Sequence, residues 1–274
     1  MMKIAQALNL YGEVDSYERQ EAVWLLEHIL KLNAFELKMR LDKFLTESQM
    51  QEYQAALKRL SEGEPLAYVI GSQPFWTLDL KVTKDTLVPR PDTEIVVETI
   101  LNDLVLPDHA SVIDLGTGSG AIALSLAKEK PDWSVLATDI YMPTLEVAKE
   151  NAYKHALKNV TFLCSEWYTS IPKQKFDLIV SNPPYIAESD SHLLALETEP
   201  YRALVSANNG LADLIELIHG AKSWLNPNGW IVLEHGYDQA AIVQTYCKNA
   251  KLSHVHTVKD YGGNDRVTLA QYLV

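Results

Sequence analysis

Four consecutive residues, Asn182-Pro183-Pro184-Tyr185, carry the most specific chemistry in the sequence. Two adjacent prolines fix φ and remove two N–H donors, so the carbonyl groups of this segment need other hydrogen-bond partners. A planar –NH2 group can donate to the Asn182 side-chain oxygen and to the Pro183 carbonyl while Tyr185 stacks on its plane. A plain turn after a strand is the alternative. We predict that all four residues bind substrate and that Asn182, Pro183 and Tyr185 are catalytic.

A glycine-rich loop, GTGSG at residues 116–120, supplies the second signal. Its glycines let the backbone turn sharply and approach a ligand without a Cβ clash. Asp139 ends the next predicted strand about 20 residues later, where a carboxylate accepts hydrogen bonds from both hydroxyls of a ribose. The predicted cofactor-binding residues here are Gly116, Thr117, Gly118, Ser119, Gly120 and Asp139.

Either a nicotinamide dinucleotide or S-adenosylmethionine fits such a loop followed by an acid. A dinucleotide fingerprint reads GxGxxG, and its loop holds a pyrophosphate. This loop reads GxGxG and follows Asp114, whose carboxylate would repel a pyrophosphate and suits the cationic end of S-adenosylmethionine. The sequence therefore favours the methyl donor.

Glu166 and Trp167 follow the third predicted strand, at the rim where ligands of open α/β sheets bind. We predict that Trp167 packs on the adenine, that Glu166 accepts from its exocyclic amine, and that Asn182 also contacts the cofactor. The alternative for Trp167 is a loop residue that covers the sheet edge. Two acceptors that hold the –NH2 hydrogens in line with a sulfonium methyl are sufficient for an SN2 transfer. We therefore expect neither a metal ion nor a covalent nucleophile.

The elements that must position these residues alternate between strand and helix from residue 111 onward. Such alternation predicts an α/β fold with a mostly parallel sheet and helices on both faces. The last two strands are joined by a link too short for a helical crossover, so we predict an antiparallel hairpin at the sheet edge. The predicted strands are Ser111–Leu115, Val135–Asp139, Val160–Cys164, Phe176–Ser181, Trp230–Glu234, His254–Lys259 and Val267–Tyr272, and the predicted helices are Ala121–Glu129, Pro143–His155, Ala212–Leu225 and Asp238–Lys248.

The first part of the chain has a helical pattern. Asp15 with Glu18, and Thr46 with Gln49, are predicted capping boxes, and a short helix is expected between the two helices that they start.

The stretch that follows reads as strand at Tyr68–Ile70 and then alternates up to Val82, which predicts a β-hairpin. A further helix is expected from Pro91. We predict a helical substrate-recognition domain at 1–64, a hairpin linker at 65–84 and a catalytic domain at 85–274.

Composition narrows the class of protein. The 274 residues carry a formal net charge of −12, which disfavours a stable complex with nucleic acid. Cys164 and Cys247 lack the spacing of a disulfide framework or a zinc site. The N-terminus reads as neither a signal nor a transit peptide, and no apolar run is long enough for a membrane span. We expect a cytoplasmic, soluble monomer that binds no membrane.

Beyond these motifs, the chain resembles the HemK/PrmC family, the peptide chain release factor N5-glutamine methyltransferases. The resemblance covers nearly the whole length, through LVPRPDTE (Leu87–Glu94), SEWY (Ser165–Tyr168), EPYRAL (Glu199–Leu204), LEHG (Leu233–Gly236) and DYGGNDRVTL (Asp260–Leu269), in addition to DLGTGSG and NPPY.

The resemblance implies a class I methyltransferase sheet, S-adenosylmethionine as donor, and the glutamine amide of the Gly-Gly-Gln loop of class 1 release factors as substrate. It supports the donor and amide positions predicted above, with Glu166 standing where relatives often have Asp. It places Arg90, Asp92 and Glu94 near the donor or the mouth of the pocket without assigning them chemistry. Glu199 is expected to fix a loop, and His235 reads better as a packed or capping histidine than as a base.

Three alternatives stay open from the sequence. A glutamine methyltransferase that acts on a ribosomal protein shares NPPY. An N6-adenine methyltransferase would present the same planar –NH2 group, but the acidic charge and the absence of a basic run oppose it. A nicotinamide-dependent oxidoreductase would leave NPPY unexplained.

Overall fold

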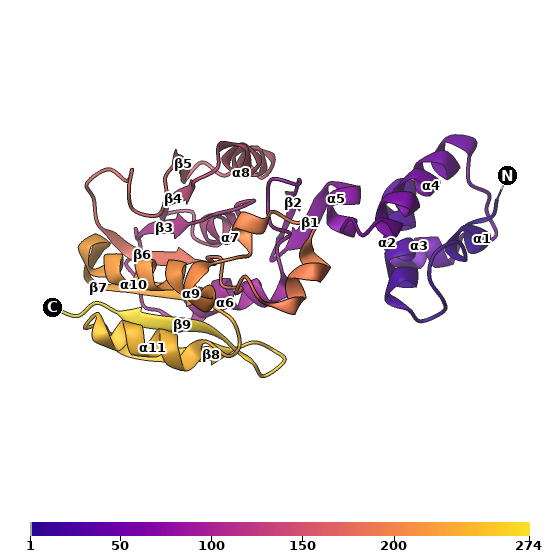
Figure 1. The fold of residues 1–274 in the computed structure, drawn as a ribbon. Helices are drawn as coiled ribbons and strands as arrows, with labels where there is room; N and C mark the ends of the chain where they lie inside the picture. The colour runs from indigo at the N-terminus through magenta and orange to yellow at the C-terminus, as the bar shows by residue number, and fades with distance from the viewer. Residues whose placement is uncertain (1) are drawn as a thin grey trace. The chain divides into compact units, whose positions relative to one another are not determined.

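The computed structural model describes residues 2–274. The chain divides into two compact units, Met1–Ser72 and Gln73–Val274 (Figure 1). The core of the first unit is an apolar cluster that includes Leu26 and Leu57. The helices of this unit are α1 (Ile4–Leu8), α2 (Tyr17–Leu30), α3 (Ala34–Lys38), α4 (Glu47–Ser61) and α5 (Leu66–Ile70).

The two predicted capping boxes had different outcomes. At the start of α4 the Gln49 N–H donates to the Thr46 hydroxyl (3.2 Å), and the Thr46 N–H donates to the Gln49 side-chain oxygen (2.9 Å), which confirms the box. The box predicted for Asp15 is wrong. Asp15 adopts a left-handed φ of 66°, and α2 instead begins after Ser16, whose hydroxyl accepts from the Arg19 N–H (3.2 Å).

The strand predicted at Tyr68–Ile70 is also wrong, because these residues lie in α5. The carbonyl of Pro65 accepts from the Tyr68 N–H (2.9 Å) at the start of this helix. Gly71, with a φ of 82°, ends it. Three apolar residues are too few for periodicity to separate a helix from a strand. The hairpin begins after this glycine, with β1 (Ser72–Phe75) and β2 (Leu78–Lys81).

A seven-stranded sheet with the order β5-β4-β3-β6-β7-β9-β8 forms the centre of the second unit. Strands β3 to β7 run parallel, whereas β9 runs antiparallel to both β7 and β8, so the predicted edge hairpin is confirmed. The strands are β3 (Ser111–Leu115), β4 (Ser134–Asp139), β5 (Val160–Cys164), β6 (Phe176–Ser181), β7 (Leu225–Glu234), β8 (Ser253–Lys259) and β9 (Asp265–Gln271).

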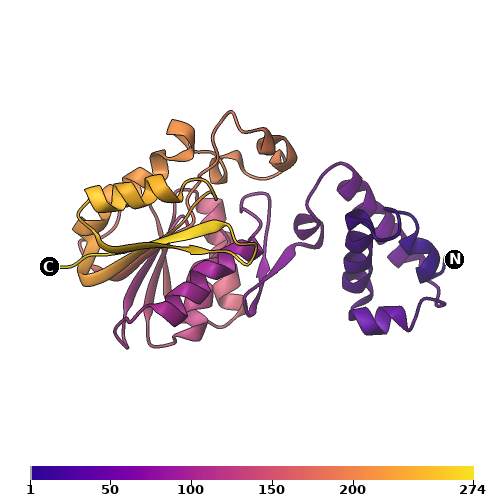
Figure 2. The same ribbon diagram turned by 90° about the horizontal axis from the view of Figure 1, so that it is seen from below.

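Helices cover both faces of this sheet (Figure 2), which confirms the predicted α/β class. Side chains along β3 point alternately to the two faces of the sheet. Val112 therefore packs in the apolar cluster that includes residues of α6 and α7, and Ile113 packs in the cluster that includes residues of α10 and α11. The helices are α6 (Glu94–Asp103), α7 (Ala121–Glu129), α8 (Met142–Lys154), α9 (Ala207–Gly210), α10 (Ala212–Trp224) and α11 (Ala240–Asn249), with 3-10 turns η1 (Pro91–Thr93), η2 (Ser191–Leu196) and η3 (Tyr201–Ala203).

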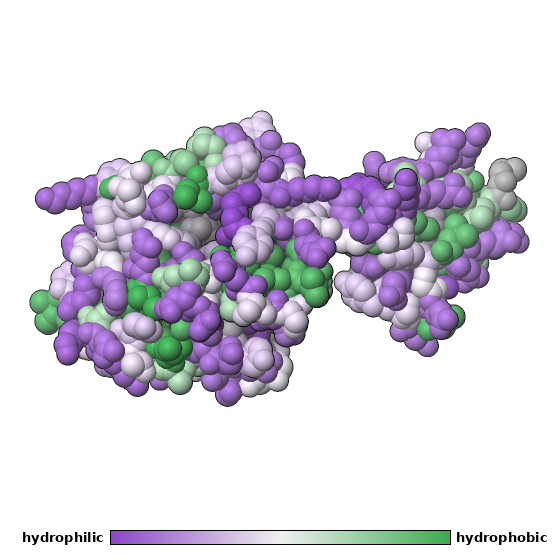
Figure 3. Space-filling view, in the orientation of Figure 1, coloured by the Kyte–Doolittle hydropathy of each residue, from purple (hydrophilic) through white to green (hydrophobic). Residues whose placement is uncertain are grey.

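The face shown in Figure 3 is largely hydrophilic, with apolar residues scattered on both units. On the first unit the exposed large apolar side chains include Val14, Tyr17, Phe35, Met39 and Phe44. Nowhere in residues 2–274 is a helix both long and apolar enough to cross a bilayer.

Candidate active site

A cavity of about 410 Å³ lies at the carboxyl ends of β3, β4, β5 and β6. Parallel strands bring the loops that follow them to one edge of the sheet, so motifs far apart in the sequence meet there. The predicted residues that line the cavity are Gly116, Thr117, Gly118, Ser119, Asp139, Glu166, Trp167, Asn182 and Pro184, whereas Gly120, Pro183 and Tyr185 are not among its lining residues.

The glycine loop is fastened to the neighbouring strand. The N–H groups of Gly116 and Thr117 both donate to the Thr138 carbonyl (2.9 and 2.7 Å). The Gly118 N–H donates to Asp139 Oδ2 (3.1 Å), and Asp139 Oδ1 accepts from the Tyr141 N–H (3.0 Å). Burial raises the pKa of Asp139 despite these hydrogen bonds. Loop and carboxylate are therefore held together at one wall of the cavity.

Asp114 lies buried beneath the loop. Its Oδ2 accepts from the Thr117 hydroxyl (2.6 Å) and from the Ala123 N–H (3.2 Å), while its Oδ1 has no hydrogen-bond partner within residues 2–274. Burial raises the pKa of Asp114 to about 7. Thr117, which Asp114 binds, lines the cavity, and an unpartnered buried carboxylate oxygen beneath this loop fits a ligand that carries positive charge, such as the methionine end of S-adenosylmethionine.

Trp167 is held from two sides. It adopts a left-handed φ of 40°, and its indole Nε1 donates to Asp213 Oδ1 (3.2 Å). A Cβ at Gly116 would lie 3.3 Å from the Trp167 ring, so a larger residue there would press on the indole. Asp213 could not be predicted from the sequence, because it lies 46 residues beyond Trp167, at the start of α10.

Two further residues outside the predicted set shape the rim. Glu199 Oε2 accepts from the Val88 N–H (3.0 Å), and its Oε1 pairs with Arg90, so it fixes the loop that leads into η1. Arg202 donates to the Asp85 carbonyl (3.0 Å), and its guanidinium lies 3.8 Å from the centroid of the Tyr141 ring. Both lie in the EPYRAL segment, for which the sequence predicted only that Glu199 fixes a loop.

The NPPY loop is pinned at both ends. Before it, the Ser181 hydroxyl donates to the Leu115 carbonyl (2.5 Å). After it, Ile186 forms a parallel bridge with Val205. The Tyr185 carbonyl accepts from Gln239 Nε2 (3.0 Å).

Asn182 lines the cavity and carries a free acceptor. Its Nδ2 donates to the Thr93 hydroxyl (3.2 Å), and within residues 2–274 neither its Oδ1 nor the Pro183 carbonyl oxygen has a hydrogen-bond partner. The pair of acceptors that the double proline predicts is therefore present in the loop.

Tyr185 packs in the core beneath the loop rather than along the cavity wall, and its hydroxyl donates to Glu234 Oε1 (3.3 Å).

His235, which follows Glu234 in the chain, is fully buried. Its Nδ1 donates to the Gly236 carbonyl (2.9 Å), its Nε2 accepts from the Thr268 hydroxyl (2.7 Å), and burial lowers its pKa. His235 is thus a packed, neutral histidine.

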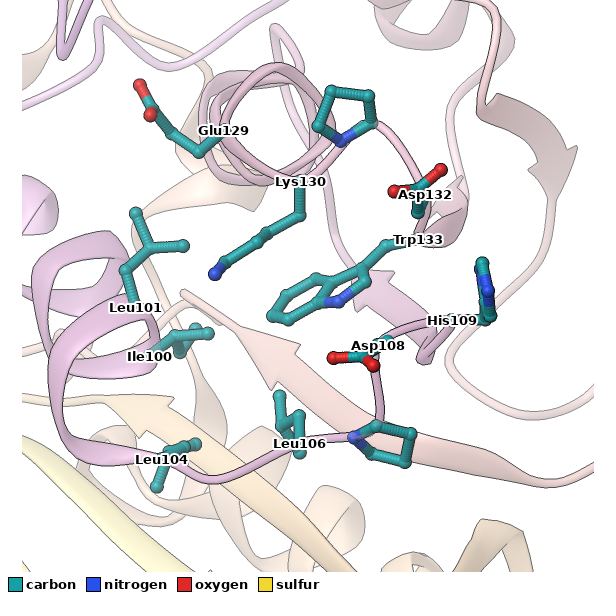
Figure 4. A pocket seen from close by; sticks show the side chains of 12 residues that line it. Ile100, Leu101, Leu104, Leu106, Asp108, His109, Glu129, Lys130, Asp132 and Trp133 are labelled. Carbon is teal, nitrogen blue, oxygen red and sulfur yellow. The ribbon is translucent and has the colours of Figure 1, made fainter.

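A second cavity, of about 490 Å³, lies at the opposite edge of the sheet, before β3 and β4 begin (Figure 4). In it the Lys130 ammonium lies 5.8 Å from the centroid of the Trp133 ring. It shares no lining residue with the first cavity. Within residues 2–274, no group of three His, Cys, Asp or Glu side chains is arranged to hold a metal ion.

Comparison with known proteins gives a consistent picture. Residues 91–259 match the methyltransferase small domain family, and residues 3–71 match the PrmC N-terminal domain family. A protein from Xylella fastidiosa named release factor glutamine methyltransferase is 45% identical and covers 96% of each chain. One of the same name from Coxiella burnetii is 41% identical over 94% of this chain and 93% of its own. A methyltransferase structure from Pyrococcus furiosus shares the fold, with a TM-score of 0.57 and 17% identity over 81% of this chain and all of its own.

Proposed function

The chain belongs to the family of release factor glutamine methyltransferases, and on that premise we propose that it methylates the glutamine side-chain amide in the Gly-Gly-Gln motif of class 1 release factors. The single observation that carries this proposal is the pair of unpartnered acceptors in the NPPY loop, Asn182 Oδ1 and the Pro183 carbonyl, of which Asn182 lines the glycine-loop cavity. Two acceptors match the two hydrogens of a primary amide.

Each wall of the cavity has a distinct task. When bound, S-adenosylmethionine supplies an electrophilic methyl group on a sulfonium. Asp139 accepts from the ribose, Asp114 faces the cationic end, and Trp167 and Glu166 hold the adenine. Asn182 and Pro183 hold the amide hydrogens and aim the nitrogen lone pair at the methyl carbon. A C–N bond forms as the C–S bond breaks, and the methylated amide releases one proton to water.

We also propose how the chain binds its protein substrate and where in the cell it acts. The helical unit, with its exposed apolar side chains, is suited to dock the body of a release factor. The net charge of −12 favours a protein partner over a polynucleotide. Two free cysteines fit a reducing compartment, so we expect a cytoplasmic location. We also expect the protein to act as a monomer.

The test combines purified protein, S-adenosylmethionine and an unmodified release factor, followed by peptide mass spectrometry. We expect one added methyl group, about 14 Da, on the Gly-Gly-Gln glutamine, because the aligned amide is the acceptor. A matched substrate with that glutamine replaced by asparagine is the control. Transfer to a ribosomal protein or to adenine, with none to the release factor, would reject the proposed substrate.

A further inference from the structure

Thr93 stands at the N-cap position of α6 but does not cap this helix. It is buried, and its side chain makes no capping hydrogen bond. Its hydroxyl oxygen instead accepts from Asn182 Nδ2 (3.2 Å). A hydroxyl has a single proton, and accepting from Asn182 leaves that proton for another acceptor.

Glu234, the last residue of β7, supplies a neighbouring acceptor. It is 1% exposed, and its Oε1 accepts from the Tyr185 hydroxyl (3.3 Å). Its Oε2 has no partner at ordinary hydrogen-bond distance within residues 2–274, yet the Thr93 hydroxyl lies near enough to lower the pKa of Glu234. The buried Glu234 carboxylate therefore contacts Tyr185 of the NPPY loop and lies close to Thr93, which holds Asn182 of the same loop.

Charged groups from three elements surround Glu234. Arg266 on β9 lowers its pKa, and Asp92 in η1 raises it. Arg266 in turn pairs with Asp260 (3.1 Å) and with Asp92 (3.5 Å). Burial outweighs the lowering influences and raises the pKa of Glu234 to about 7. This carboxyl group therefore changes its protonation near neutral pH.

We propose that Glu234 and Thr93 are positioning residues that orient the Asn182 amide through a directed chain of hydrogen bonds. The inference rests on the proposed function, in which Asn182 Oδ1 receives the substrate amide. An ionised carboxylate only accepts, so Thr93 turns its proton toward Glu234 and its lone pair toward Asn182. Asn182 then offers Nδ2 to Thr93 and Oδ1 to the substrate. If the Asn182 side-chain amide were turned over, its –NH2 group would face the –NH2 group of the substrate amide.

Glu234→Gln tests the direction of this chain at nearly constant shape. The new amide can donate to Thr93, so Thr93 can donate to Asn182 and the Asn182 side chain turns over. At saturating donor, we expect kcat on the release factor to fall about 100-fold. Donor affinity by calorimetry should stay within about 2-fold, because the chain does not touch the donor. A wild-type kcat in this variant would overturn the proposal.

Thr93→Val removes the hydroxyl and keeps the branched shape. We expect kcat to fall about 10-fold or more, with Thr93→Ser restoring most of it, since serine retains the hydroxyl. Thr99→Val is the matched control, because Thr99 is a buried threonine on α6 outside the cavity lining. Equal losses at both threonines, or no rescue by serine, would mean a merely structural role and reject the chain.

The pH profile supplies a readout that misfolding would not mimic. Protonation of Glu234 adds a donor where the chain needs an acceptor, so wild-type kcat should rise with pH through about 7. In Glu234→Gln this rise of kcat with pH should disappear. Saturating donor is used so that the effect of Asp114 ionisation on donor binding does not enter kcat. Persistence of the rise in that variant would contradict the proposal. If the wild type itself leaves the release factor unmethylated, the proposed function fails instead.

Discussion

The two halves of the cavity are built in different ways. The donor half consists of a glycine loop and Asp139, and backbone N–H groups of the loop donate to the Thr138 carbonyl and to the Asp139 carboxylate. The amide half consists of the NPPY loop, which depends on the side chains of Thr93, Glu234 and Gln239 from distant parts of the chain. The donor half is thus held by contacts between neighbouring strands and loops, whereas the amide half forms only when distant parts of the chain come together in the complete fold.

This contrast has a physical reason. A cofactor pocket can use backbone N–H groups and carboxylates at strand ends, which any parallel sheet places at one edge. Orienting a side-chain amide requires fixed donors and acceptors around it, and these must come from other elements. Damage to the two halves should therefore appear in different quantities, transfer rate for one and donor affinity for the other.

The largest effect is expected from Asn182→Ala. It removes the acceptor that aligns the amide in the transition state, so kcat should fall about 1000-fold. Donor affinity should change by less than about 3-fold, because the donor contacts remain. Methyl incorporation into the release factor and calorimetry measure the two quantities. Full activity would exclude the proposed role of Asn182.

Gly210→Ala should disturb the amide half through the backbone. Gly210 has a φ of 82°, and a Cβ there would lie 2.1 Å from the Tyr185 carbonyl oxygen. Overlap added to left-handed strain should cost about 3 kcal/mol in the free energy of unfolding. Gly263→Ala is the matched control, with a φ of 84° and no atom within 4 Å, and should cost about 1 kcal/mol. Urea unfolding measures both, and equal costs would refute the steric explanation.

Asp139→Ala should act on the donor half. Loss of hydrogen bonds between a carboxylate and the ribose should cost about 2 kcal/mol, a weakening of donor affinity of about 30-fold. At saturating donor, kcat should stay close to the wild-type value. Calorimetric titration with S-adenosylmethionine measures the affinity, and an unchanged dissociation constant would remove Asp139 from this role.

The smallest effect is a pH dependence of donor binding. The pKa of Asp114 is raised to about 7, and the cationic donor is attracted only by the ionised form. Binding should therefore strengthen with rising pH, by about 10-fold between about pH 6 and pH 8. Asp114→Asn should abolish this slope. A slope of equal size in the variant would assign the titration to another group.

The regular part of the fold was predictable from sequence. Ser111–Leu115 and Phe176–Ser181 coincide with β3 and β6, because buried parallel strands read as short apolar runs. Tyr68–Ile70 was mistaken for a strand, since three apolar residues suit either conformation.

The candidate site likewise has residues that could be predicted from the sequence and residues that could not. The glycine loop and Asn182 were identifiable because each follows a predicted strand, and Asp139 because it ends one; residues 116–119, Asp139 and Asn182 all line one cavity. Thr93, Glu234 and Asp213 were not, because each works through a partner at least 46 residues away, as Asp213 does with Trp167. Pairing over such distances leaves no local pattern. The motifs LVPRPDTE and LEHG contain two of these residues, but only the structure gives them partners.

The bridge between Ile186 and Val205 also bears on how such a protein can change over time. It closes the chain between these residues into a loop whose two ends lie beside each other. The entropy of closing a loop grows slowly with its length, about 0.6 kcal/mol for each doubling. Insertions near η2, away from Glu199 and Arg202, could therefore accumulate without moving Asn182. New surface can therefore form there while Asn182 stays in place.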